Sequence, residues 1–127
     1  MKSVRAHLEN KDVAFKDFGV FKPDSCDYPT VVIPAVDAIT AGVCDKGIFI
    51  CGTGIGISIA ANRYQNIRAA LCTDIFMAEM SRAHNDANVL VLGGRVVNAG
   101  LAVNLVDTFL ATSFSGDQRH KRRIELL

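Results

Sequence analysis

Short, continuously apolar runs alternate along the chain with longer segments whose apolar residues recur at helical spacing. Three of these runs are typical of strands buried on both faces, and they cover residues 46–51, 67–72 and 88–93. A further strand is predicted over Val13–Phe18, followed by a loop over 19–28 that contains Gly, Pro and Asp. Helices are predicted over residues 3–10, 29–41 and 99–112, and in a short basic segment at the C-terminus. Two more are predicted between the strands: one runs from the glycine-rich stretch after residue 51 to Asn62, and one runs from an N-cap at Asp74 to His84.

This alternation of strand and helix predicts a parallel sheet covered on both faces. We therefore predict an α/β fold: a doubly wound parallel sheet in a Rossmann-like three-layer sandwich. A length of 127 residues corresponds to one domain, spanning 1–127. Ligands of such sheets bind at the carboxyl ends of the strands. The first candidates for a site therefore lie together along one rim, and they are Cys51 with its glycine loop, Asp74 and Gly93–Arg95.

Composition narrows the possible functions. The formal net charge is +1 and tryptophan is absent, so we expect neither a nucleic acid nor a membrane surface as partner. No apolar run approaches the length of a membrane span. The four cysteines show no C-x-x-C spacing, which predicts reduced thiols and no metal site. The first 30 residues hold many charges and no apolar signal-peptide core, so we expect a cytoplasmic protein.

The segment CGTGIGIS, from Cys51 to Ser58, follows a buried strand and opens a helix. Its three glycines allow a tight turn that exposes consecutive backbone N–H groups, which favour an anion. The positive end of the following helix favours the thiolate form of Cys51. A thiolate beside an anion-stabilising loop suits proton abstraction next to a carbonyl group.

Two other interpretations of this segment remain open. It could be a tight strand–helix turn with a buried structural cysteine. It could also bind a dinucleotide, since Asp74 lies about 20 residues beyond the loop, as that fingerprint requires. Ile57, however, occupies the third glycine position of G-x-G-x-x-G, so the fingerprint is broken.

Two further segments carry candidate residues. His84 and Asn85 fall at a predicted helix end, where a histidine could move protons near neutral pH or simply cap the helix. Arg119 and Arg123 are four residues apart and would share a helix face, and two guanidinium groups so placed suit a phosphate. The alternative for this second pair is a solvated basic tail.

Taken together, these segments resemble the ribose-5-phosphate isomerase type B family, which includes the galactose-6-phosphate isomerase subunits. The matching motifs occur in family order over nearly the whole chain. They are DYP (27–29), CGTGIGISIAAN (51–62), IRAALC (67–72), SRAHNDANVL (81–90), GGRVV (93–97) and RHKRR (119–123).

The resemblance implies an aldose–ketose isomerase that acts through an enediol, in which Cys51 takes a proton from C2 and delivers it to C1. Some family members use a glutamate at the position of Ile57, so the isoleucine here indicates the cysteine branch. No metal or organic cofactor is implied. The resemblance also implies that Thr53 and the amides of Gly52, Gly54, Ile55 and Gly56 hold the enediolate oxygens. It implies that His84 helps open the sugar ring, that Asn85 binds a sugar hydroxyl and that Tyr28 lines the site. Arg119 and Arg123 are implied to bind the phosphate, with Arg95 and His120 as their neighbours.

The resemblance also implies homodimers, often paired into tetramers, with sites shared between subunits. Family members begin with a strand, an Asp-His motif and a glycine turn before the helix matched here by residues 2–10. We therefore expect the sheet to lack this first strand and to expose an edge. The leading function is interconversion of ribose 5-phosphate and ribulose 5-phosphate. The alternatives are a six-carbon substrate such as allose 6-phosphate, or a non-catalytic subunit that binds sugar phosphates.

Overall fold

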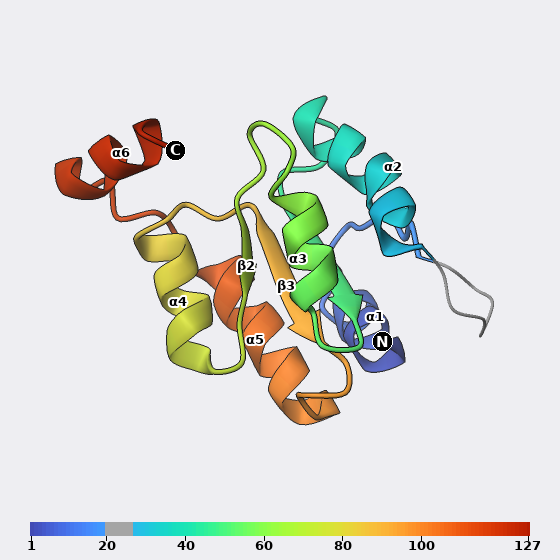
Figure 1. Cartoon of the computed structure of the whole chain (residues 1–127). Coiled ribbons are helices and arrows are strands. Elements are labelled where there is room, and N and C mark those ends of the chain that lie inside the picture. The colour runs from blue at the N-terminus through green and yellow to red at the C-terminus, as the bar shows by residue number, and fades with distance from the viewer. Residues whose placement is uncertain (20–26) are drawn as a thin grey trace.

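A computed structural model describes residues 1–19 and 27–127 (Figure 1). In this described part a parallel sheet of three strands, in the order β1-β3-β2, is flanked by helices, which confirms the predicted α/β fold. The strands are β1 (Gly47–Cys51), β2 (Ala69–Leu71) and β3 (Val89–Gly93). The helices are α1 (Lys2–Asn10), α2 (Tyr28–Thr40), α3 (Ile55–Ala61), α4 (Ile75–Ala83), α5 (Ala99–Ala111) and α6 (Gln118–Glu125).

The central strand β3 is buried on both faces and divides the core into two layers. Successive side chains of a strand point to opposite faces. Leu90 and Leu92 therefore pack with α1, α4 and α5, while Val89 and Val91 pack with α2 and α3. This arrangement is the predicted sandwich of helix, sheet and helix.

Polar caps begin three of the helices. Asp74 accepts a hydrogen bond from Met77 N–H at 2.8 Å, as the predicted N-cap requires. Asn98 and Asp117 accept corresponding bonds at the starts of α5 and α6. None of the helices found in residues 1–19 and 27–127 combines the length and the apolar character needed to cross a membrane.

The strand predicted over Val13–Phe18 is wrong, because residues 13–19 have no regular secondary structure and Val13 and Phe15 are exposed. A strand needs a neighbour for its backbone hydrogen bonds. Within the described residues β1 pairs on one side with β3 and forms an edge of the sheet, which agrees with the predicted exposed edge. The loop predicted over 19–28 lies mostly outside the described residues.

Candidate active site

The loop after β1 is joined to the end of β3 through the backbone. Cys51, half-buried at the last position of β1, pairs with Gly93 of β3. Its carbonyl oxygen accepts a hydrogen bond from Gly94 N–H at 2.7 Å, and the Gly52 carbonyl accepts one from Arg95 N–H at 2.9 Å. The predicted rim of Cys51 and Gly93–Arg95 is therefore present.

Glycine is required at two positions where this loop meets β3. Gly54 has φ of 82°, a left-handed conformation, and a Cβ there would lie 2.5 Å from Leu71 Cδ1. A Cβ at Gly93 would lie 2.5 Å from the Thr53 carbonyl oxygen. Because the backbones touch directly, the position of Cys51 relative to its loop is tightly fixed.

Side chains predicted to belong to the site surround this loop. The Tyr28 ring at the start of α2 lies over Gly56, within 2.6 Å of where a Cβ would stand, and the Arg95 side chain lies beside Gly52. Thr53 Oγ1 accepts a hydrogen bond from Ile55 N–H at 3.2 Å, so this amide is already used.

The amides of Gly56 and Ile57 lie in the first turn of α3, where N–H groups have no partner inside the helix. The Ile57 side chain is buried between α3 and the sheet.

A second group of predicted residues gathers where α4 ends and α6 approaches it. The His84 and His120 rings stack with centroids 4.2 Å apart and planes 20° apart. Arg119 Nη2 lies 3.3 Å from His120 Nε2. An open hollow of about 200 Å³ is present here. It is lined by His84, Asn85, His120, Arg123, Ile124 and Leu127.

The electrostatics of this hollow favour an anion. Burial lowers the pKa of His120, electrostatic repulsion by the neighbouring His84 and Arg119 lowers it further, and the Asp117 carboxylate opposes this shift. Arg123 adds a further cation to the lining. Among residues 1–19 and 27–127, no three His, Cys, Asp or Glu side chains come close enough to form a metal site.

The structure places these two groups at opposite ends of β3. Cys51 and its loop lie at the carboxyl end, whereas His84 and Asn85 precede Val89 at the amino end. The strand between them spans about 13 Å, at about 3.3 Å per residue. Figure 1 shows α6 standing off from the body, away from the loop that joins β1 to α3. One chain therefore holds two separate groups of candidate residues, which we call the loop half-site, around Cys51, and the basic half-site, around His84 and α6.

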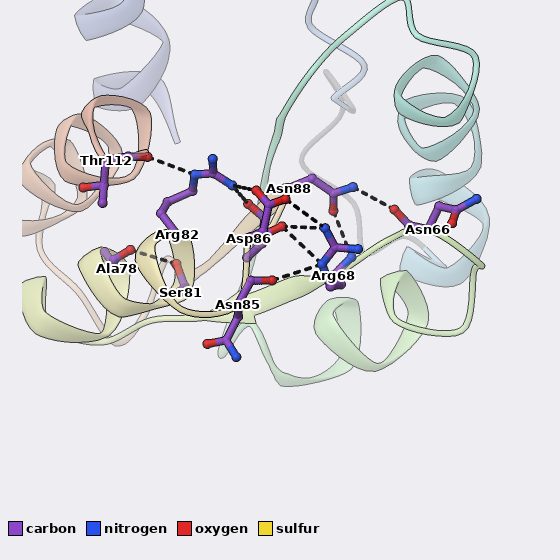
Figure 2. A network of polar contacts seen from close by, with 10 residues as sticks. Asn66, Arg68, Ala78, Ser81, Arg82, Asn85, Asp86, Asn88 and Thr112 are labelled. Carbon is purple, nitrogen blue, oxygen red and sulfur yellow. Dashed lines mark hydrogen bonds and ion pairs between the residues drawn. The ribbon is translucent and has the colours of Figure 1, made fainter. Parts of the chain in front are cut away.

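Sequence reasoning missed three charged residues behind the basic half-site, namely Arg68, Arg82 and Asp86 (Figure 2). Arg82 is 8% exposed, although its side chain belongs to a type that is almost never buried without a partner. Its Nη1 donates to Asp86 Oδ1 at 2.9 Å, and Arg68 Nη2 lies 3.5 Å from Asp86 Oδ2. The signal available in the sequence was an arginine four residues before an aspartate at a helix end.

Comparison with known proteins identifies the family of the chain. The ribose/galactose isomerase family profile matches residues 1–127. Ribose-5-phosphate isomerase B of Escherichia coli K12 is 43% identical over 122 residues, which are 96% of this chain and 81% of that protein.

Two solved structures also superpose closely. Ribose-5-phosphate isomerase B of Clostridium thermocellum gives a TM-score of 0.95 at 47% identity, covering 98% of this chain and 84% of that one. A ribose 5-phosphate isomerase of Thermotoga maritima gives the same TM-score and identity, covering 98% of this chain and 86% of that one. The chain therefore belongs to the ribose/galactose isomerase family of enzymes.

Proposed function

We propose that this protein interconverts ribose 5-phosphate and ribulose 5-phosphate through an enediol, with Cys51 as the base. The observation that carries the proposal is the position of Cys51, half-buried at the end of β1 and joined to a glycine loop that begins a helix. The relatives described above support this substrate, because all three are named as ribose-5-phosphate isomerases.

The reaction needs one base and a group of donors for the developing oxyanion. The Cys51 thiolate would take the proton from C2 of the open-chain aldose and return it to C1. Thr53 Oγ1 accepts from Ile55 N–H, which leaves its own hydroxyl proton free to be donated to an enediolate oxygen. The amides of Gly52, Gly54 and Gly56 would complete the cradle, and Tyr28 and Arg95 would border the sugar.

The basic half-site would supply ring opening and phosphate binding. His84 would move the proton that opens the furanose ring, and Asn85 would hold a sugar hydroxyl. Arg119 and Arg123, with His120 beside them, would bind the phosphate. Binding of this remote group orients the reacting carbons without taking part in the proton transfer.

We propose that a second copy of the chain joins the two half-sites. Within one chain β3 separates them, so Cys51 and His84 cannot reach one small sugar. In a dimer with twofold symmetry, the loop of one chain can face the basic half-site of its partner. Exposed apolar side chains beside the loop support such an interface, since Ile55 is 55% exposed and Ile59 is 60% exposed on α3.

Substitution of the proposed base tests the function. We expect Cys51→Ala to reduce kcat for ribose 5-phosphate by about a thousandfold, because general-base catalysis supplies about that factor. Cys44→Ala is the matched control, a partly buried free cysteine away from the loop, and should retain parental turnover. Ketose formation is measured directly, with allose 6-phosphate assayed in parallel.

A Cys51→Ala protein with near-parental turnover would refute the base assignment. A parental chain that is active on allose 6-phosphate but inactive on ribose 5-phosphate would refute the proposed substrate. Binding of ribose 5-phosphate with no ketose formed would select the non-catalytic subunit instead.

A further inference from the structure

We propose that Arg82, which does not line the hollow, is a positioning residue that holds the His84–Asn85 turn and the approach to α6 in one fixed arrangement. The inference rests on the proposed function for its catalytic consequence. Its structural content rests on the contacts of one buried guanidinium group with two separate parts of the chain.

The first set of contacts fixes the turn that carries His84 and Asn85. Arg82 Nη1 donates to Asp86 Oδ1 at 2.9 Å and to the Ala87 carbonyl oxygen at 2.6 Å. Asp86 has φ of 45°, and its N–H returns to the Arg82 carbonyl at 3.2 Å, which ends the helix in the left-handed manner. The guanidinium therefore stabilises a strained reversal directly after the two site residues.

The second set of contacts reaches the end of α5. Arg82 Nε donates to the Thr112 carbonyl oxygen at 3.1 Å, and the guanidinium carbon lies 5.8 Å from the centre of the Phe109 ring. Just beyond Thr112, Ser115 N–H donates to the Ala83 carbonyl at 3.1 Å. The segment leading to α6 is thus tied to the end of α4, and the stacking of His120 on His84 depends on this alignment.

A second arginine, Arg68, supports the same turn from the position just before β2. Arg68 Nε donates to the Asn85 carbonyl at 3.0 Å, and its Nη2 donates to the Asp86 carbonyl at 2.9 Å. Figure 2 shows the Asp86 carboxylate between the two guanidinium groups. Cations at the carboxyl end of a helix also interact favourably with its dipole. Removing the charge of either Arg82 or Asp86 would leave the other charge poorly compensated.

The network lies behind the hollow. The hollow is lined by residues of the α4–β3 turn, of α6 and of the C-terminus, but by none of Arg68, Arg82 or Asp86. A change at Arg82 can therefore affect an anion in the hollow mainly through the placement of His84, Asn85 and α6. The loop half-site, at the other end of β3, should be unaffected.

The experiment compares the two half-sites in Arg82→Met and Arg82→Lys, using the full chain. Inorganic phosphate is titrated to probe the basic half-site, and the nuclear Overhauser contact between the rings of His84 and His120 reports their stacking. The chain has three histidines, so these resonances can be assigned by substitution. The rate of Cys51 alkylation by iodoacetamide reports the loop half-site.

We expect Arg82→Met to weaken phosphate binding by about tenfold or more, as the loss of charge-assisted hydrogen bonds predicts. It should also abolish the ring contact and leave Cys51 alkylation within about twofold of the parent. An ammonium reaches fewer acceptors than the guanidinium fork, so Arg82→Lys should give an intermediate loss. Arg63→Met, at an exposed arginine after α3, is the matched control and should match the parent in all three readouts.

Arg82→Met with parental phosphate affinity and an intact ring contact would overturn the proposal. An equal change in both half-sites would also overturn it, because that is the signature of a general loss of stability. If Arg82→Met does not fold, the same criteria apply to Arg82→Lys and to Asp86→Asn. A parental chain that binds phosphate in an Arg82-dependent way but forms no ketose would refute the proposed function and leave this inference standing.

Discussion

At the carboxyl end of the sheet, the loop half-site is held by backbone: Gly54 and Gly93 allow main chain to lie directly against main chain. At the amino end, the basic half-site is held by charged side chains, with Arg82 and Asp86 at its centre. The first arrangement depends on the absence of a Cβ. The second depends on ionised groups and on the approach of α6.

The difference suits the two tasks proposed for the half-sites. Proton transfer at C2 and C1 requires a fixed geometry between the base and the oxyanion donors, which rigid backbone provides. Phosphate binding requires positive charge, which has to be brought together by side chains from several elements. The loop half-site should therefore be sensitive to added volume, and the basic half-site to charge and pH.

Mixing two inactive variants would test whether the half-sites of different chains combine, and it has the largest expected effect. Cys51→Ala and His84→Ala, each inactive alone, are unfolded together in equal amounts and refolded. Random pairing into symmetric dimers should restore about one quarter of the parental activity, since each mixed dimer holds one intact site. The measurement is ketose formation before and after mixing.

The matching control mixes Cys51→Ala with Cys51→Ser, which removes the same proposed base and should remain inactive. No recovery in the first mixture, with dimers present, would contradict the shared site.

Added volume at Gly54 should damage the loop half-site. Gly54→Ala places a Cβ in a left-handed backbone and 2.5 Å from Leu71 Cδ1, and it should lower the free energy of unfolding by about 3 kcal/mol. Gly42→Ala isolates the backbone contribution: Gly42 has φ of 79° with nothing within 4 Å of the added Cβ, and about 1 kcal/mol is expected. Urea denaturation measures both. Equal losses would show that the loop does not pack as tightly as described.

Lowering the pH should loosen the basic half-site, and we expect this to be the smallest of the three effects predicted here for the two half-sites. The folded-state pKa of His120 lies below its usual value of 6.5, so the unfolded chain takes up this proton first as the pH falls. The stability contributed by neutral His120 stacked on His84 is complete above pH 6.5 and is lost as the pH falls through the pKa of His120. The loop half-site contains no histidine and should not respond.

Titration of the histidine ring resonances measures this behaviour. Without ligand, the midpoint for His120 should lie below 6.5, and inorganic phosphate should raise it, because a bound anion favours the protonated imidazole. A midpoint at or above 6.5 in the free protein would contradict the described environment of His120.

Much of the fold was accessible from the sequence. The buried strands are apolar throughout, as parallel strands covered on both faces must be, and the glycine spacing after Cys51 marked the turn. The segment Val13–Phe18 has a strand-like pattern, but a pattern does not supply the neighbouring strand that a ladder requires. The family assignment was predictable because the loop and HNDANVL motifs occur together, and the comparisons confirm it.

The support of the basic half-site could not be predicted in the same way. Arg82 bonds the carbonyl of Thr112, thirty residues further along the chain, and no local periodicity reports such a contact. The sequence pattern also does not give the order of the strands, in which β3 lies between β1 and β2. The roles assigned to the site residues remain predictions.

The five residues of β3 also have a consequence at the level of the cell. A chain whose two half-sites lie at opposite ends of a strand can be perfectly folded and still hold no complete site. Under the shared-site proposal, dilution below the pairing concentration splits every site while leaving every domain intact. The rate then rises with the square of the chain concentration, so protein abundance itself becomes a control on the flux.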